Sequence, residues 1–134
     1  MTPEKAPEMQ RRIFIRDFRL QVSIGIHDFE KEEPQTVVVN VDLLLEPESK
    51  AHNDRIANVL NYDTVHDGIT DLAGSRHFNL QETLVDAILD LCLAQPGVIE
   101  ARVSTEKPDV YPDCASVGVE VFGFGHEPQG APPA

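Results

Sequence analysis

The hydrophobic pattern predicts an α+β domain with elements in the order ββααββ, in which four strands form one antiparallel sheet and two helices cover one of its faces. Two observations carry this prediction. Apolar and polar residues alternate in two segments at each end of the central region, and apolar residues recur at helical spacing in two segments between them. Two helices cover only one face of such a sheet, so its other face and its edges are left for another chain.

The first two strands are expected at 12–23 and 35–46, joined by a polar loop from Gly25 to Pro34. The alternation in the first strand slips at Asp17–Phe18, and charged residues stand between the apolar ones, as in a half-buried strand. One face of the second strand is entirely apolar, with Val37, Val39, Val41, Leu43 and Leu45. Its other face adds further apolar residues, which favours oligomerisation.

Helical spacing begins at 62–73, where one face carries Val65, Ile69 and Leu72. The second helix is expected at 81–94 and ends before Pro96 and the glycine that follows it. Its apolar stripe contains Leu84, Val85, Ile88, Leu91 and Cys92. Two further alternating segments, at 98–106 and 115–123, complete the predicted sheet.

The 134-residue chain is acidic, because 11 Lys and Arg residues against 23 Asp and Glu residues give a formal net charge of −12. That balance argues against DNA, RNA or an anionic membrane as the main partner, since phosphate binding needs clustered positive charge. No apolar run approaches the roughly 20 residues of a membrane-spanning helix, and no signal peptide is visible. We therefore expect one cytoplasmic domain at 12–122, between disordered tails at 1–11 and 123–134.

Four residues are candidates for chemistry, and each also has an ordinary structural interpretation. Glu30 lies in a charge-rich loop, where a solvated surface cluster is the simpler interpretation. Tyr62 opens the first helix, either as a half-buried packing residue or as a proton donor. Glu82 stands three residues after Asn79, the spacing of a capping box. Lys107 ends the third strand before a proline, where a lysine is usually exposed and inert unless burial or a neighbouring charge alters it.

Several chemistries have no support in the sequence. The two cysteines, Cys92 and Cys114, are too few for a disulfide framework or a zinc site. The five histidines form no HxH or HxxxH pair, so no metal site is expected. The absence of GxGxxG, P-loop and GxSxG motifs argues against nucleotide binding and against the commonest serine hydrolases.

Four motifs follow one another through the central region: IGIHDFEKEEPQ at 24–35, LNYDTV at 60–65, FNLQETLVDAI at 78–88 and TEKPDVYPDCASVGVEV at 105–121. Together, on the ββααββ pattern, they resemble the dihydroneopterin aldolase family of folate biosynthesis over about residues 12–122. The resemblance implies the tunnelling fold (T-fold), in which the sheets of several subunits join into a β-barrel ring. It also implies a homo-tetramer, or a homo-octamer of two stacked rings, with active sites at subunit interfaces.

The resemblance further implies a lyase that cleaves 7,8-dihydroneopterin by a retro-aldol reaction into 6-hydroxymethyl-7,8-dihydropterin and glycolaldehyde. Carried over by position, Lys107 would act at the reacting side chain of the substrate, and Tyr62 of the neighbouring subunit would transfer a proton. The other implied residues of this pocket are Glu30, as a catalytic residue, and the substrate-binding residues Glu82, Gln35, Leu80 and Gln81.

These residue types suit such a substrate. A pterin presents an amino group and a ring N–H side by side, and a carboxylate such as Glu82 accepts hydrogen bonds from both. The substrate's own C6=N5 imine delocalises the charge left when the C1′–C2′ bond breaks, so no Schiff base, metal or organic cofactor is needed. Lys107 would stabilise developing negative charge or lower the pKa of a bound water, and Tyr62 would return a proton.

Other functions stay open at this stage. Epimerisation at C2′ of dihydroneopterin or its triphosphate would use much the same residues. A triphosphate also requires basic residues, for which the sequence offers few candidates, Arg76 and His77. A non-catalytic pterin-binding oligomer would need Glu82 and leave Lys107 and Tyr62 replaceable. A zinc-dependent pterin synthase of the same fold is disfavoured, because the histidine spacing is missing.

Overall fold

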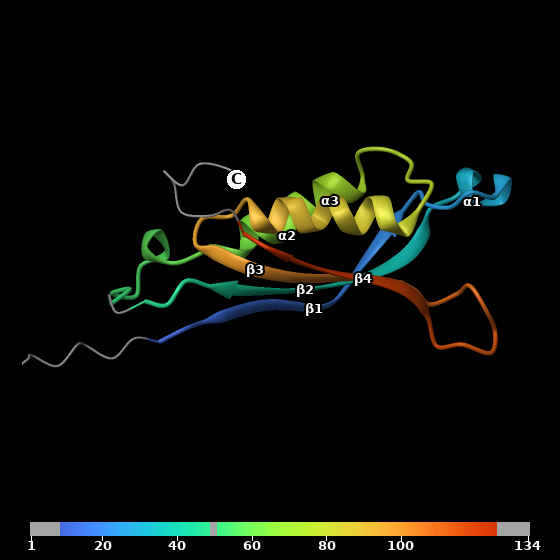
Figure 1. The fold of residues 1–134 in the computed structure, drawn as a ribbon. Helices are drawn as coiled ribbons and strands as arrows, with labels where there is room; N and C mark the ends of the chain where they lie inside the picture. The colour runs from blue at the N-terminus through green and yellow to red at the C-terminus, as the bar shows by residue number, and fades with distance from the viewer. Residues whose placement is uncertain (1–8, 49–50, 126–134) are drawn as a thin grey trace, which may run out of the picture.

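A computed structural model describes residues 9–48 and 51–125, which form one α+β fold (Figure 1). One antiparallel sheet contains the strands in sequence order: β1 (Arg12–Val22), β2 (Gln35–Leu45), β3 (Val98–Lys107) and β4 (Val117–Phe124). The helices are α1 (Asp28–Glu32), the 3₁₀ turn η1 (Ile56–Asn58), α2 (Tyr62–Ala73) and α3 (Gln81–Leu93). The predicted fold class, with its ββααββ order and antiparallel sheet, is confirmed.

The core lies between the sheet and the two long helices. Figure 1 shows α2 and α3 on one face of the sheet, with α3 over β3 and β4 and α2 beside α3 and β1. Every residue of the predicted apolar face of β2 is buried. The helices contribute the buried residues Val65, Ile69, Leu84, Val85, Ile88 and Cys92. Since each fully buried aliphatic side chain stabilises the fold by about 1.5–3 kcal/mol, these stripes hold the helices on the sheet.

The predicted slip in β1 is a β-bulge. The pairing of β1 with β2 shifts register between Ile15 and Phe18, and Asp17 has a positive φ of 53°. The side chain of Asn40 on β2 accepts a hydrogen bond from the Asp17 N–H at 2.8 Å, which satisfies the bulged backbone. The extra residue restores the alternation, so Phe18 packs against the core on the same face as Ile15.

The structure differs from the sequence prediction mainly in the connections. The expected polar loop after β1 contains α1, whose five residues are too few to produce a helical period in the sequence. β4 continues to Phe124, two residues beyond the expected domain boundary at 122. Met9 pairs with Glu48 in an isolated bridge, although it falls within the expected tail 1–11. The rest of the expected tails, residues 1–8 and 126–134, lies outside the described residues.

The face of the sheet without helices is partly apolar. Phe14 of β1 and Phe122 and Phe124 of β4 are exposed there, whereas Val38 of β2 is buried. β1 and β4 form the two edges of the sheet, and exposed edges can pair with another chain. Within the described residues, no helix is long and apolar enough to cross a membrane.

Candidate active site

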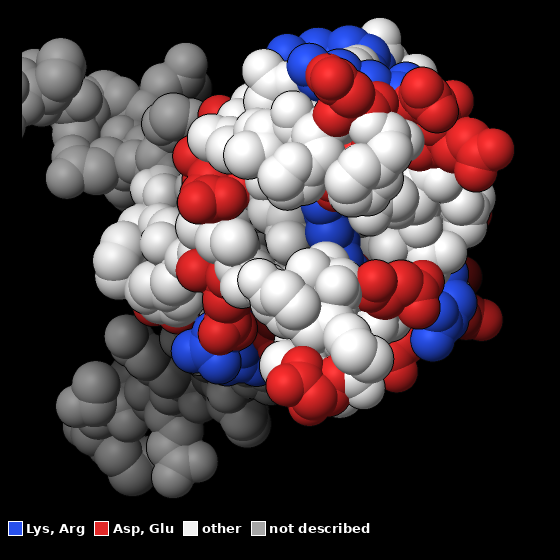
Figure 2. Space-filling model, turned by 90° about the vertical axis from the view of Figure 1, so that its right-hand side faces the viewer, with Lys and Arg blue, Asp and Glu red and all other residues white. Residues whose placement is uncertain are grey.

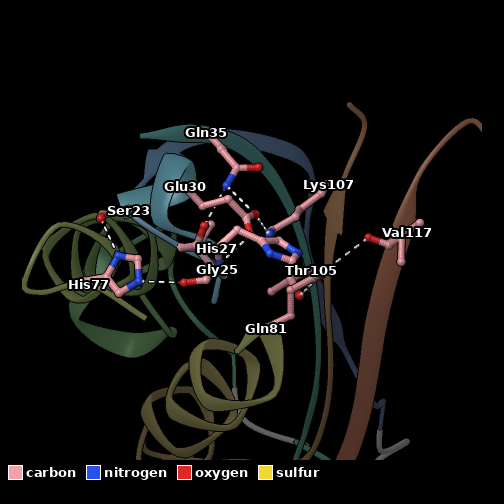
Figure 3. Close-up of polar contacts among 11 residues, drawn as sticks. Ser23, Gly25, His27, Glu30, Gln35, His77, Gln81, Thr105, Lys107 and Val117 are labelled. Carbon is pink, nitrogen blue, oxygen red and sulfur yellow. Dashed lines mark hydrogen bonds and ion pairs between the residues drawn. The ribbon is translucent and has the colours of Figure 1, made fainter. Parts of the chain in front are cut away.

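Glu30 lies at the end of the sheet where β2 begins and β3 ends, and its side chain is almost fully buried. Its Oε2 accepts hydrogen bonds from Lys107 Nζ at 3.0 Å and from Gln35 Nε2 at 2.9 Å. Its Oε1 accepts one from the His27 N–H at 3.2 Å. Figure 3 shows how the turn after β1, the start of β2 and the end of β3 converge on this one carboxylate.

The surroundings of Glu30 stabilise its ionised form. Burial by itself raises the pKa of the carboxyl, but hydrogen bonds from Gln35, Lys107 and the His27 N–H outweigh it. Together with the positive charge of Lys107, they lower the pKa of Glu30 from 4.5 to about 2. Glu30 is therefore ionised at neutral pH, and a carboxylate with so low a pKa is a weak base.

Lys107 is the last residue of β3, and its side chain is only 10% exposed. The surface interpretations of Glu30 and Lys107 from sequence are therefore wrong, because two opposite charges can be buried together when they pair and are hydrogen-bonded. Figure 2 views the molecule from this end and shows a hollow with a basic side chain at its floor, surrounded mostly by uncharged residues.

The first residues of α3 lie against the same end of β3. Thr105 Oγ1 donates a hydrogen bond to Gln81 Oε1 at 3.0 Å, and Gln81 Nε2 donates to the Val117 carbonyl oxygen at 3.3 Å. The amide of Gln81 is thus occupied in fastening α3 to β3 and β4. Lys107 lies two residues after Thr105, on the same face of β3.

Glu82 is exposed in the first turn of α3, and Leu80 before it is exposed as well. The predicted capping box is wrong, since the helix begins one residue later than that motif requires. Its N-cap is Leu80 rather than Asn79, and no side chain caps it. None of the hydrogen bonds and ion pairs among the described residues uses the Glu82 carboxylate, which is left facing solvent.

Tyr62 lies at the other end of the sheet. It is exposed and begins α2, whose N-cap Asn61 accepts a hydrogen bond from the Asp63 N–H at 2.9 Å. Asn61 lines an open groove of about 500 Å³ with residues where β2 ends and β3 begins, among them Leu45 and Gly97. The length of β3, about 30 Å, therefore separates this groove from Lys107. The structure brings Glu30, Gln35 and Lys107 together but leaves Tyr62 apart from them.

A histidine, a tyrosine and the two cysteines in and near the four sequence motifs have structural positions. His27 is exposed and stacks on Phe29, with ring centroids 5.4 Å apart. Tyr111 and Cys114 are exposed in the loop between β3 and β4. Burial raises the pKa of the Cys92 thiol to about 12, so this cysteine is a core residue and not a nucleophile.

Of the two basic candidates for a triphosphate, His77 is engaged by hydrogen bonds within the chain, whereas Arg76 is exposed. Both ring nitrogens of His77 form hydrogen bonds, to the Ser23 hydroxyl and to the Gly25 carbonyl oxygen. The Arg76 guanidinium lies 4.6 Å from the centre of the Phe78 ring. Sequence reasoning missed Ser23 and Gly25, and only the glycine before a polar loop was a signal that could have pointed to a special turn.

The fold and this site define a class of protein. It is an α+β protein with a buried lysine–carboxylate pair at one end of its sheet, and the helix start that is bonded to the same strand carries an exposed carboxylate. Among the residues that the structure describes, no group of three or more His, Cys, Asp or Glu side chains could hold a metal ion.

Comparison with known families identifies this class more closely. The family model named FolB, dihydroneopterin aldolase, matches residues 13–122. The chain therefore belongs to the dihydroneopterin aldolase family, and the resemblance noted in the sequence is confirmed.

Individual relatives carry two different activity names. The chain is 31% identical over 121 residues to a dihydroneopterin triphosphate 2′-epimerase of Pseudomonas aeruginosa, covering 90% of this chain and 98% of the relative. It is also 31% identical over 98 residues to a dihydroneopterin aldolase of Streptomyces coelicolor, covering 73% and 82%. Both names belong to the same family, so membership alone does not choose between cleavage and epimerisation.

Solved structures of the family have the same fold. The crystal structure of dihydroneopterin aldolase from Burkholderia thailendensis bound to guanine has a TM-score of 0.76 and 39% identity, covering 87% of this chain and 93% of that one. The Escherichia coli dihydroneopterin aldolase in complex with neopterin has a TM-score of 0.78 and 23% identity, covering 84% and 98%. At 23% identity, the similarity to the Escherichia coli structure supports the fold alone.

Proposed function

We propose that this protein is a dihydroneopterin aldolase of folate biosynthesis, a lyase that cleaves 7,8-dihydroneopterin into 6-hydroxymethyl-7,8-dihydropterin and glycolaldehyde. The observation that carries the proposal is the buried contact of 3.0 Å between Lys107 and Glu30, beside a helix start with a free carboxylate. Family membership supports it, as does the guanine, a bicyclic ring related to a pterin, that is named for the Burkholderia thailendensis structure.

In this proposal, Glu82 binds the pterin ring. Its carboxylate is exposed and faces no partner among the described residues, so both oxygens are available for the amino group and the ring N–H of the substrate. Gln81 supports it indirectly, because its bonds to Thr105 and Val117 fix the helix start that carries Glu82. Leu80, which is exposed beside it, offers apolar surface to the ring.

Lys107 acts at the reacting side chain of the substrate. The 2′-hydroxyl loses its proton, the C1′–C2′ bond breaks, C2′ becomes the aldehyde carbon of glycolaldehyde, and the electron pair moves from C1′ into the C6=N5 imine. A proton then returns to C1′ to give the hydroxymethyl group. The Lys107 ammonium, held by ionised Glu30 and Gln35, stabilises the developing charge or orients the water that carries the proton. Its ion pair favours this electrostatic role over a Schiff base, which requires a neutral amine.

Tyr62 would come from a second copy of the chain. Its neighbour Asn61 lines the groove where β3 begins, and the length of β3, about 30 Å, separates that groove from Lys107, so Tyr62 does not serve the site of its own chain. β1 and β4 form the edges of the sheet and can pair between subunits of a closed ring, and we propose that Tyr62 of one chain approaches Lys107 of its neighbour in such a ring. We propose a homo-tetramer, or an octamer of two such rings, for this reason.

The second candidate function is 2′-epimerisation of dihydroneopterin triphosphate. The similarity to the Pseudomonas aeruginosa epimerase favours it. The engagement of both His77 ring nitrogens within the chain speaks against a triphosphate substrate, since of the two candidates only the exposed Arg76 is left to bind a phosphate.

Product analysis tests both candidates. The purified protein is incubated separately with 7,8-dihydroneopterin and with its triphosphate, and the pterins are separated by chromatography. We expect 6-hydroxymethyl-7,8-dihydropterin with an equal amount of glycolaldehyde from the unphosphorylated substrate. Formation of the C2′ epimer alone would assign the protein to the epimerase branch, and tight pterin binding without any turnover would remove the catalytic proposal.

A further inference from the structure

His77 makes two hydrogen bonds to the end of β1 and the turn that follows it. Its Nδ1 lies 2.6 Å from Ser23 Oγ, and its Nε2 lies 2.8 Å from the Gly25 carbonyl oxygen (Figure 3). A carbonyl oxygen only accepts, so Nε2 carries the proton, and Nδ1 of the neutral ring accepts from the Ser23 hydroxyl. Both nitrogens of this partly buried ring are thereby used inside the chain.

The neighbouring backbone reinforces this contact. Phe78 forms a parallel bridge with Ile24, in which the Phe78 N–H donates to the Ser23 carbonyl oxygen at 2.9 Å and the Gly25 N–H donates to the Phe78 carbonyl oxygen at 2.8 Å. The Phe78 side chain is fully buried. Residues 77–78 thus hold the end of β1 through the backbone, and the His77 side chain adds a hydrogen bond to the turn.

Gly25 transmits the position of this turn to Glu30. Its φ of +129° is open to glycine, and a Cβ at this position would lie only 2.2 Å from the Glu30 carboxyl carbon. The backbone of Gly25 therefore packs directly against the carboxylate that holds Lys107. Gln35 donates to both the Ile24 carbonyl oxygen at 2.6 Å and Glu30, so the turn and the carboxylate share a donor.

The same segment leads into the helix that carries Glu82. Phe78 is followed by Asn79 and Leu80, and α3 begins at Gln81. His77 consequently stands between the two halves of the site described above: its ring is tied to the turn that packs on Glu30, and its backbone continues to the start of α3.

We propose that His77 is a positioning residue of this site, which sets the place of the Glu30–Lys107 pair relative to Glu82 through the Gly25 carbonyl oxygen. This inference rests on the proposed function for its effect on catalysis. His77 touches no reacting atom. Its loss lets the turn after β1 shift, and a shift of about 1 Å at a reacting group can reduce turnover about 100-fold.

The test compares His77→Ala, His77→Gln and Ser75→Ala. The glutamine Nε2 can donate to the Gly25 carbonyl oxygen as the imidazole Nε2 does, whereas alanine cannot. Ser75 is the control, since it lies in the same loop and its hydroxyl donates at 2.7 Å to the Leu72 carbonyl oxygen, away from the turn. For each variant, kcat, KM and the exchange rate of the Gly25 amide hydrogen are measured.

We expect His77→Ala to lower kcat by about 10- to 100-fold with a smaller change in KM, and to speed exchange of the Gly25 amide. His77→Gln should recover most of the lost kcat and of the amide protection, and Ser75→Ala should leave both near the wild-type values. An unchanged kcat in His77→Ala, or a glutamine variant no better than the alanine variant, would overturn the proposal.

The amide exchange separates this proposal from the proposed function. If the wild-type protein shows no turnover, the proposed function fails. Faster exchange of the Gly25 amide in His77→Ala, slowed again in His77→Gln, would then still support the positioning role. Equal exchange rates in wild type, His77→Ala and His77→Gln would overturn it.

Discussion

The two ends of the sheet differ in whether their polar side chains are hydrogen-bonded to one another. At the end where β3 finishes, Glu30, Gln35 and Lys107 are buried or half-buried and bonded to one another. At the end where β3 starts, Tyr62 is exposed beside an open groove, and its neighbour Asn61 is used to cap α2. One end holds preorganised charges, whereas the other presents an aromatic hydroxyl without surroundings that would make it reactive.

In the proposed mechanism, neither end is a complete site in the single chain. In that mechanism the charged end supplies electrostatic stabilisation, whereas the Glu30 carboxylate, ionised at neutral pH, has no proton to return. A second chain that places its exposed end against the charged end would complete both.

The largest effect is expected from Lys107→Met, which removes the ammonium and keeps the length of the side chain. We expect kcat to fall about 1,000-fold, within the range found for loss of a charge-stabilising or proton-transferring group. Lys31→Met is the matched control, because Lys31 lies exposed on α1 and no part of the proposed site includes it. Steady-state cleavage of 7,8-dihydroneopterin at saturating substrate measures the effect, and equal kcat values for the two variants would refute the role of Lys107.

Joining of the two ends is tested by mixing inactive subunits. Tyr62→Phe and Lys107→Met are each expected to be nearly inactive alone. If each site takes Lys107 from one chain and Tyr62 from another, random reassembly of equal amounts recovers about one quarter of the wild-type activity, because that fraction of sites has both native residues.

The control for this mixture pairs Lys107→Met with Tyr111→Phe, whose exposed tyrosine lies in the loop between β3 and β4. Tyr111→Phe should be active before mixing, so its mixture with Lys107→Met shows only how inactive subunits dilute active ones. No recovery in the Tyr62→Phe mixture, with reassembly verified by tagged subunits, would contradict a site shared between chains.

A smaller effect is expected from Glu82→Gln. One acceptor of the proposed bidentate contact becomes a donor, so we expect pterin binding to weaken about 10- to 100-fold, the usual consequence of losing a charge-assisted hydrogen bond. Because Glu82 is exposed, the melting temperature should hardly change. Asp86→Asn, one turn along the same helix and also exposed, is the control. Quenching of pterin fluorescence measures both dissociation constants, and equal values would exclude Glu82 as the ring anchor.

The sequence predicted the sheet and the long helices well, because those elements depend on periodic burial. The β1 bulge at Asp17 and the buried face of β2 follow directly from alternation. Burial of Glu30 was not predictable from composition, since it depends on Lys107, which lies 77 residues further along the chain. The capping box failed for a similar reason: Gln81 is fixed by bonds to β3 and β4, and the helix starts from Leu80. The spacing of residues within one segment of the sequence does not reveal such contacts between distant segments.

The smallest expected effect concerns the acid stability of the charged end. The pKa of Glu30 is lowered from 4.5 to about 2, so its contribution to the free energy of unfolding is present above pH 4.5 and is lost as the pH falls toward 2. In that window the unfolded chain binds a proton that the folded chain does not. Glu30→Gln should therefore lose less stability on acidification, with a slope smaller by up to about one proton per chain. Glu32→Gln, an exposed neighbour on α1, should keep the wild-type slope, and urea unfolding between pH 6 and pH 2.5 measures all three. Parallel slopes for wild type and Glu30→Gln would mean that the carboxylate is not held by Lys107 and Gln35 in solution, and the contrast between the two ends of the sheet would be lost.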